Sequence, residues 1–229
     1  HLGNIVLIDG KPVLFDAIEF DPEIATTDVI YDFAFPLMDL LHFGQMQTAN
    51  QLFNGYIRAT WREQSSALAL LPLFLSVRAA IRANVLLTKH GQHSEDPSIA
   101  TEAERYFDLA LRLLAPEAPL LLAIGGKSGT GKSVLARDIA GSIAPPPGAL
   151  ILRSDVIRKE LHGVDEHTTL PAASYTAEAA DRVYRAIFER AARALVQGVS
   201  VIVDAAFLKP HERAAAEAAA RDADVAFSG

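Results

Sequence analysis

Hydrophobic and polar residues follow three successive patterns along the chain. Two short apolar segments near the start, NIVLID and KPVLFDAIEF, are separated by Asp9-Gly10, a dipeptide typical of tight hairpin turns. From Thr27 to about Leu114, hydrophobic residues recur at the spacing of amphipathic helices. Beyond residue 119, short apolar runs alternate with helical segments. The chain is therefore expected to begin with a hairpin, continue as helices and end as an alternating α/β domain.

Helices are expected through the middle of the chain, over residues 26–44, 46–63, 65–91 and 98–115. A threonine would cap the first of them, Gly44 would end it, and Ser98 would cap the last. The sequence APEAP, residues 115–119, interrupts this pattern, because proline disfavours a helix at its own position and just before it. We place the domain boundary there, with one domain over residues 1–116 and another over 117–229.

Apolar runs in the second domain have the length of buried strands, and helical segments separate them. These runs are LLLAIGG, GALILRSD, VSVIVDAAF and VAFSG. Such alternation favours a parallel sheet covered by helices. We therefore predict an α/β protein, whose first domain is mostly helical and whose second domain is a parallel sheet with flanking helices.

Composition narrows the partners and the compartment. The net charge is −7 and no run of lysine or arginine occurs, so a nucleic-acid backbone is an unlikely partner. The chain has no cysteine, which excludes disulfides and suits a reducing cytoplasm. The longest apolar run, Ala67 to Val77, is too short to span a bilayer and contains Pro72. We expect a cytoplasmic protein without a membrane partner, in which this run is a buried helix.

The motif GGKSGTGKS, residues 125–133, fits the phosphate-loop pattern G-x-x-x-x-G-K-[ST] between an expected strand and an expected helix. Glycines let the backbone curl around an anion, and the amides of residues 128–133 would meet it where the helix dipole favours negative charge. The alternative, a glycine-rich turn with a chance lysine, is disfavoured by the full spacing. We expect ATP to be bound by Gly126, Ser128, Gly129, Thr130, Gly131, Lys132 and Ser133.

Two side chains of this region are candidates for Mg²⁺ ligands. Lys132 would reach the β- and γ-phosphates and act in catalysis, while the Ser133 hydroxyl would ligate Mg²⁺. Asp204, which ends the run VSVIVD, would be the second ligand, as a Walker B-type carboxylate. The alternative for Asp204 is an aspartate that caps the turn after its strand.

The phosphate loop and the segment after the second run, RSDVIRKEL, resemble the small P-loop kinases of the gluconate kinase, shikimate kinase, polynucleotide kinase and zeta-toxin type. The resemblance implies that Asp155 orients or deprotonates the acceptor hydroxyl, and that Arg153 and Arg158 contact the substrate. Alternatively, Ser154 or Asp155 caps the helix that follows. Lys209 and Arg213 are expected on a solvated helix face. Kinases of this type carry an arginine-bearing lid, which we expect to lie beyond Gly229.

The start of the chain, HLGNI followed by LFDAIEF, resembles the catalytic segment of the aminoglycoside phosphotransferase-like kinases. The resemblance implies Asn4 and Asp16 as Mg²⁺ ligands, and Asp32 as the aspartate that braces the catalytic loop. It also implies that residues 1–116, with their helices from Thr27 to Leu114, are the C-terminal lobe of a protein-kinase-like fold. Ordinary hairpin polarity is the alternative for Asn4 and Asp16. The family's catalytic aspartate is expected before His1, so we expect a fragment that is truncated at both ends and impaired as an enzyme by the truncation.

Together the two resemblances indicate a bacterial fusion of an aminoglycoside phosphotransferase-like domain with a P-loop kinase or AAA-family ATPase domain. The implied activity is transfer of the ATP γ-phosphate to a hydroxyl of a small molecule, with Mg²⁺ as cofactor. A regulatory ATPase acting on a protein partner, a polynucleotide-end kinase and a nucleotide-sensing module are the alternatives. The sequence specifies neither the acceptor nor an oligomeric state.

Overall fold

The computed structural model describes residues 2–15, 26–93, 96–115 and 117–229. The chain divides into two compact units, and the segment Asn50–Leu68 belongs to the second of them together with Glu117–Gly229. The first unit consists of His1–Ala49 and Ala69–Pro116. The joint after Pro116 coincides with the expected domain boundary. The expected domains differ from these units in one segment, because residues 50–68 pack with the sheet that follows them in sequence.

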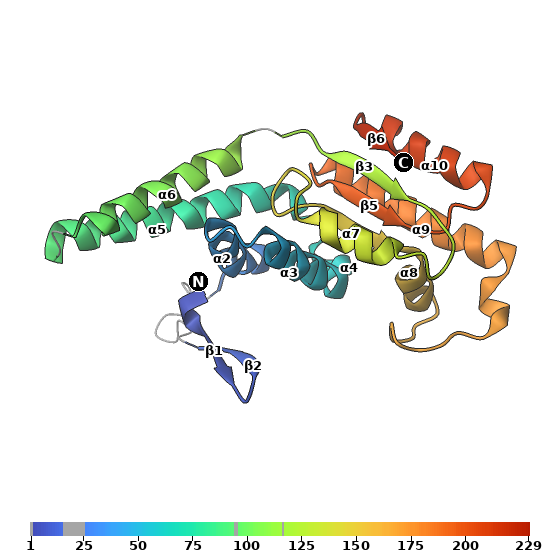
Figure 1. The fold of residues 1–229 in the computed structure, drawn as a ribbon, viewed down its shortest axis with the longest axis horizontal. Coiled ribbons are helices and arrows are strands. Elements are labelled where there is room, and N and C mark those ends of the chain that lie inside the picture. Colours follow the sequence, from blue (N-terminus) through green and yellow to red (C-terminus); the bar gives the residue numbers. More distant parts are fainter. Residues whose placement is uncertain (1, 16–25, 94–95, 116) are drawn as a thin grey trace. The chain divides into compact units, whose positions relative to one another are not determined.

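The first unit opens with the predicted hairpin (Figure 1). A short 3-10 helix, η1 (Leu2–Asn4), leads into strands β1 (Ile5–Ile8) and β2 (Lys11–Leu14), which pair antiparallel. Ile8 and Lys11 are register partners, so Asp9 and Gly10 form a two-residue turn. Their φ angles of 51° and 74° are those of the primed turn that this dipeptide favours. The hairpin prediction is confirmed for the described residues.

Helices make up the rest of the first unit. They are α2 (Val29–His42), the beginning of α3 (Met46–Ala59), α5 (Leu71–His93) and α6 (Pro97–Leu114). The expected caps of α2 and α6 are wrong by one or two residues. The carboxylate of Asp28 accepts the Ile30 N–H at 2.8 Å, and that of Asp96 accepts the Ser98 N–H at 2.9 Å. In each case an aspartate close to the expected cap accepts the unpaired backbone N–H groups of the first helical turn instead.

One stretch of the described chain, Leu68–Gly91, is long and apolar enough to cross a membrane by length and composition alone. This is weak evidence, because core helices pass the same test. Within the first unit, α5 packs against α2 and α6. Its Arg78 donates from Nε to the Tyr31 carbonyl at 3.1 Å, and its guanidinium lies 3.8 Å from the centre of the Tyr31 ring. The helix thus packs within the folded unit, but the expectation of a buried helix over this run is wrong, because only 28% of the apolar window is buried and Leu73 and Val77 are exposed.

Asp39 on α2 binds the start of the chain. Its carboxylate is 3% exposed and accepts the Leu2 N–H at 2.9 Å and the Tyr106 hydroxyl at 3.2 Å. Burial is the main reason why the pKa of Tyr106 is raised to about 12. Asp32, expected to brace this segment, is instead exposed and lies 3.6 Å from Arg78. The described aspartate of α2 that binds the start of the chain is therefore Asp39, two helical turns after Asp32, where the side chain faces inward. The bracing role expected for Asp32 stays a prediction.

The second unit contains a four-stranded parallel sheet in the order β4-β5-β3-β6. Its strands are β3 (Leu120–Ile124), β4 (Leu150–Arg153), β5 (Val201–Asp204) and β6 (Ala226–Ser228). Its α-helices are the end of α3, α4 (Trp61–Gln64), α7 (Lys132–Ala140), α8 (Ser154–Leu161), α9 (Ala177–Val196) and α10 (Pro210–Asp222). It also contains the 3-10 helix η3 (Ala172–Tyr175) and the first residue, Leu68, of the 3-10 helix η2 (Leu68–Leu70). The α/β prediction is confirmed, with the expected strands at the expected places.

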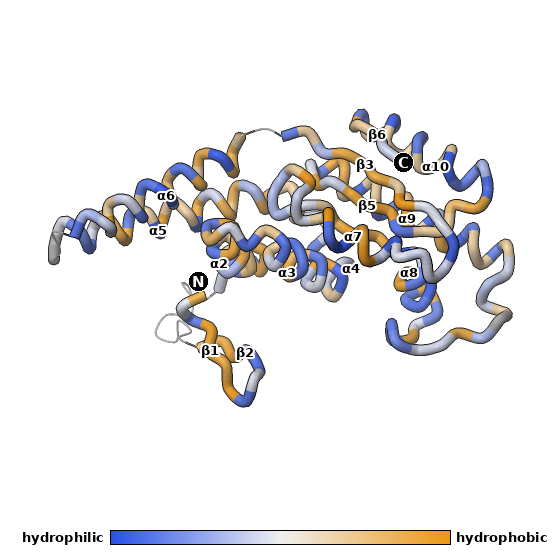
Figure 2. Tube along the Cα trace, in the orientation of Figure 1, coloured by the Kyte–Doolittle hydropathy of each residue, from blue (hydrophilic) through white to orange (hydrophobic). Residues whose placement is uncertain are grey.

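Helices cover both faces of this sheet. α7 packs against β4 and β5, and α9 packs against the same strands and against α10. Parallel crossovers are right-handed, so α7 lies on one face and α9 and α10 on the other (Figure 1). Strands β3 and β5 are hydrophobic throughout most of their length, as Figure 2 shows, because both of their faces are covered. The kinase-lobe identity expected for residues 1–116 stays a prediction.

Strand β4 is at the edge of the sheet, and asparagines of α3 bond to two backbone groups at its start. Asn54 accepts the Ile151 N–H through Oδ1 at 2.7 Å and donates from Nδ2 to the Ala149 carbonyl at 3.0 Å. Asn50, which is 2% exposed, donates to the Ala149 carbonyl at 3.0 Å as well. The amide of Asn54 thus replaces a neighbouring strand.

Replacing Asn54 with alanine is expected to destabilise the second unit. The change leaves the Ile151 N–H without its acceptor, and such a loss costs about 1–3 kcal/mol. The measurement is the free energy of unfolding from urea titration. Asn84→Ala is the matched control, since Asn84 is exposed on α5. An equal effect of the two changes would contradict the role of Asn54.

Candidate functional site

The phosphate-loop motif forms the connection between β3 and α7. Gly126, Gly129 and Gly131 have φ angles of 144°, 81° and 85°, in a region that other residues rarely adopt. α7 begins at Lys132, with Gly131 as its N-cap residue. The motif therefore has the predicted strand–loop–helix context, and its glycines stand where the backbone needs them.

Side chains of the loop converge on one carbonyl group. The Thr130 hydroxyl donates to the Lys127 carbonyl oxygen at 2.8 Å, and Lys132 Nζ donates to the same oxygen at 2.7 Å. A Cβ added at Gly126 would stand 3.1 Å from Thr130 Oγ1 and 3.5 Å from Lys132 Cδ. Gly126 is thus required both by its backbone angle and by the approach of the two side chains that close the loop.

Asp204 ends the central strand β5, between the ends of its two neighbours. Its register partners are Ile124, where β3 enters the phosphate loop, and Arg153, the last residue of β4. The Asp204 carboxylate is 5% exposed and accepts the Ser133 hydroxyl at 2.5 Å. Arg153 Nε lies 3.5 Å from the same oxygen. The structure brings the two predicted metal ligands, Ser133 and Asp204, together. The contacts of Asp204 join the carboxyl ends of neighbouring strands, and none of them caps the turn after β5, which was the alternative role.

The donor set suits Mg²⁺ rather than a fully protein-coordinated metal. Among the described residues, no group of three or more histidine, cysteine, aspartate or glutamate side chains gathers as a metal site. One carboxylate and one hydroxyl, Asp204 and Ser133, are available here. Mg²⁺ keeps several waters and takes further ligands from phosphates, so it needs few protein ligands.

Asp155 lies in the first turn of α8, directly after β4. Its carboxylate is about half exposed and lies 3.0 Å from Lys159 Nζ, one turn along the helix. Lys159 also donates to the Glu166 carbonyl at 2.6 Å. The N-cap residue of α8 is Arg153, which makes no side-chain capping bond. Neither Ser154 nor Asp155 is the N-cap, so the alternative role expected for them is not observed.

The two arginines expected to contact a substrate are engaged within the protein. Arg153 pairs with Asp204, and Arg158 donates from Nη1 to the Ser174 carbonyl at 3.0 Å. The Arg158 guanidinium also lies 5.0 Å from the centre of the Tyr175 ring. These contacts fix Arg158 against η3. A substrate-binding role for either arginine stays a prediction.

A group of residues that the sequence did not single out holds the loop after β5. Phe207 has a φ of 51°, which is unusual for a bulky residue. Its N–H donates to the Tyr184 hydroxyl oxygen at 2.9 Å, and its carbonyl accepts from Arg213 at 2.7 Å. This loop is bonded to the phosphate loop, because the Gly126 N–H donates to the Ala206 carbonyl at 3.2 Å. Arg213 is therefore more than part of a solvated helix face.

The start of α10 fixes the other end of this loop. Glu212 is 5% exposed, and its carboxylate accepts the Lys209 N–H at 3.1 Å, which is the glutamate half of a capping box. Burial raises the pKa of Tyr184 to about 12, so the phenol remains neutral beside Glu212. The sequence KPHE, with proline at the first helical turn and glutamate after it, could have indicated Glu212. Nothing local marks Tyr184, which comes from α9.

Of the two Mg²⁺ ligands predicted in the first unit, Asn4 and Asp16, the structure describes Asn4. Asn4 is half-buried at the end of η1, and its carbonyl accepts the Phe15 N–H at 3.0 Å beside the hairpin. Asp16 lies outside the described residues. Their role as Mg²⁺ ligands stays a prediction.

Comparison with known proteins identifies the second unit in part. Residues 121–228 match the family described as AAA domain. Uncharacterized proteins of Mycobacterium bovis (Mb2027c) and Mycobacterium tuberculosis (Rv2004c) are each 32% identical over 223 residues, or 96% of this chain. The chain spans 43% of the length of these relatives. No solved structure matches the chain with significance. The chain thus contains a P-loop, AAA-type nucleotide-binding domain over residues 121–228.

Replacing Gly126 with alanine is expected to weaken nucleotide binding by about tenfold or more, since the loop must open to admit a Cβ. Titration of ADP with Mg²⁺ by calorimetry measures the affinity. Gly91→Ala is the matched control, because Gly91 lies in α5 with nothing within 4 Å of an added Cβ. Unchanged ADP affinity in Gly126→Ala would contradict a nucleotide site at this loop.

Proposed function

We propose that the AAA-type domain is an ATP-dependent kinase that transfers the γ-phosphate to a hydroxyl group of a small molecule. The observation that carries the proposal is the convergence of three strand ends. β3 leads into the phosphate loop, β4 into Asp155, and β5 ends at Asp204. In a parallel sheet these carboxyl ends lie at one edge, where ligands of open α/β folds bind.

The residues of this edge have complementary roles in phosphoryl transfer. Lys132 would neutralise charge on the β- and γ-phosphates, and the loop amides would orient them. Ser133 and Asp204 would hold Mg²⁺, which supplies further charge neutralisation when bound. Their mutual hydrogen bond places the two oxygens within 2.5 Å of each other. Positioning and charge neutralisation are most of what this reaction requires.

Asp155 would accept the proton of the attacking hydroxyl. Its carboxylate is about half exposed, so an acceptor can approach it. Lys159, whose side chain is 13% exposed, lies 3.0 Å away and restrains it on the first turn of α8. A carboxylate held at the end of the strand beside Asp204 is a suitable general base for an alcohol.

The two alternative functions, a regulatory ATPase and a polynucleotide-end kinase, differ from the proposed kinase in the role they give Asp155 and in the surface charge they need. A regulatory ATPase that acts on a protein partner needs no base for an organic hydroxyl, so Asp155 would have no chemical role. A polynucleotide-end kinase needs a basic face for its substrate, whereas the chain carries a net charge of −7. The small-molecule kinase is favoured on both counts.

The first unit would be the helical lobe of an aminoglycoside phosphotransferase-like kinase fused to the second. The features that support this proposal are the hairpin that follows the start of the chain, the helices after it, and the bond from Leu2 N–H to Asp39. The fusion would work in the cytoplasm, with a small-molecule acceptor and without a membrane or nucleic-acid partner.

Lys132→Ala is expected to abolish phosphoryl transfer. The full-length protein, with both ends of this chain restored, and its Lys132→Ala variant would each receive Mg²⁺, a small-molecule cell extract and ATP labelled in its γ-phosphate, and the products would be separated. We expect a labelled metabolite from the wild type and a loss of about 100-fold or more in the variant, because a charge-stabilising group is removed. Release of free phosphate without any labelled metabolite would refute the kinase proposal and favour the ATPase.

Asp155→Asn is expected to lower the rate constant of transfer by about 100-fold, which is the usual size of a general-base contribution. The KM for ATP should change little, since Asp155 lies outside the phosphate loop. Asp108→Asn, at an exposed position of α6, is the matched control. Equal losses in transfer rate and in ATP affinity would show that Asp155 has only a structural role.

A further inference from the structure

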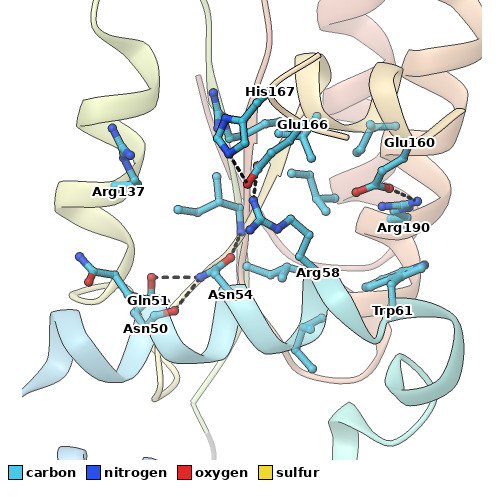
Figure 3. A pocket seen from close by; sticks show the side chains of 18 residues that line it. Asn50, Gln51, Asn54, Arg58, Trp61, Arg137, Glu160, Glu166, His167 and Arg190 are labelled. Carbon is cyan, nitrogen blue, oxygen red and sulfur yellow. Dashed lines mark hydrogen bonds and ion pairs between the residues drawn. The ribbon is translucent and has the colours of Figure 1, made fainter. Parts of the chain in front are cut away.

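A cavity of about 350 Å³ lies beside the edge strand β4 in the second unit. It is bounded by the end of α3, α4, α7, α8, α9 and the loop at Glu166 and His167 (Figure 3). Its lining contains none of Lys132, Ser133, Asp155 and Asp204. The cavity is therefore a separate space from the phosphate loop, and its volume is in the range of small-molecule sites.

Part of the cavity wall is apolar. Val156 and Ile157 of α8 contribute side chains, as does Ile151 of β4. The indole of Trp61 stands on the side where Figure 3 also shows Glu160 and Arg190, and the Arg190 guanidinium lies 5.4 Å from the centre of its ring. An apolar or ring-shaped group of a ligand would be desolvated against these residues.

Basic side chains outnumber acidic ones around this cavity. Four arginines line it, and the acidic residues among the lining are Glu160 and Glu166. Arg58 lies 2.5 Å from Glu166, and Arg190 lies 2.7 Å from Glu160. Arg153 is paired with Asp204. Arg137 is therefore the one arginine of the lining whose charge is not balanced by a described ion pair.

Arg137 has donors to spare. Its side chain is exposed, and its Nε donates to the Ser133 carbonyl at 3.1 Å. In the described part of the chain its guanidinium has no ion pair, so its remaining donors face solvent at the cavity. It lies on the side of the cavity that also carries Gln51 (Figure 3). A guanidinium with two free N–H₂ groups matches a carboxylate or phosphate in a bidentate geometry.

We infer that this cavity is a binding site for a small organic anion, with an apolar body against Ile151, Val156 and Trp61 and its acidic group on Arg137. The excess of arginine over glutamate in the lining favours an anion in the cavity. This positive charge is local, because the protein as a whole carries a net charge of −7. The inference does not depend on which phosphoryl acceptor the kinase uses.

The site is connected to the nucleotide site by short contacts. Arg137 bonds the backbone of Ser133, and Arg153, which also lines the cavity, contacts Asp204. An anion that engages Arg137 therefore acts on a residue bonded to the predicted metal-binding serine. A ligand here is expected to change nucleotide affinity, and by linkage nucleotide is expected to change ligand affinity.

The test uses the fluorescence of Trp61, which is the single tryptophan of the chain. The probes are cyclohexanecarboxylate and cyclohexyl phosphate, with the neutral cyclohexanecarboxamide as the comparison, because none of them absorbs where tryptophan is excited. We expect a saturable change of emission with millimolar anions and a weaker response to the carboxamide. No saturable change with either anion, or an equal response to the carboxamide, would overturn the inference.

Variants locate the response. Arg137→Gln should weaken anion binding by about tenfold, since one charged hydrogen-bond partner is lost, whereas Arg62→Gln, exposed on α4 and outside the cavity lining, should not. Gly55→Leu should block binding without loss of stability, because Gly55 lines the cavity, has nothing within 4 Å of an added Cβ, and lies in a helix. Wild-type affinity in both Arg137→Gln and Gly55→Leu would overturn the inference.

Lys132→Ala separates this site from the proposed kinase. The Trp61 response to the anions should persist in this variant, because Lys132 does not line the cavity. Loss of the response would show that the anions bind at the phosphate loop, and would overturn the inference while leaving the kinase proposal intact.

Discussion

The carboxylate of Asp204 holds together the edge of the sheet on which the site is built. It is buried at the end of the central strand β5, accepts the hydroxyl of Ser133 from α7, and faces the guanidinium of Arg153 from β4. A buried charge is tolerated only when it is paired and hydrogen-bonded, so these partners are required by the position of Asp204. One residue thus fixes the phosphate loop relative to the strand that precedes Asp155.

A second layer of contacts fixes the loop that follows β5. Phe207 keeps an unusual backbone angle because both its N–H and its carbonyl are bound by side chains of flanking helices, Tyr184 and Arg213. The same loop accepts the amide of Gly126. The glycine-rich loop is therefore supported by residues far from it in sequence. Preorganisation of this kind lets backbone amides act on phosphates without rearrangement.

The sequence was sufficient for local features and insufficient for contacts between distant segments. The hairpin turn, the strands and the phosphate loop have patterns that depend on neighbouring residues alone, and each lies where it was expected. The caps of α2 and α6 were misplaced because an aspartate competes with the threonine or serine beside it. The roles of Asn54, Tyr184 and Asp39 depend on partners that lie 23 to 97 positions away, which no local pattern encodes.

The amides that α3 offers to β4 have a consequence for the solubility of the domain. An uncovered edge strand presents a row of free N–H and carbonyl groups to any other strand in solution, and natural proteins avoid such edges because they lead to aggregation. Here Asn50 and Asn54 occupy two groups of that row, the Ala149 carbonyl and the Ile151 N–H. A domain cut at the joint after Pro116 would lack both asparagines and expose β4. The minimal stable form of the AAA-type domain therefore has to carry residues 50–68, which precede it in the sequence.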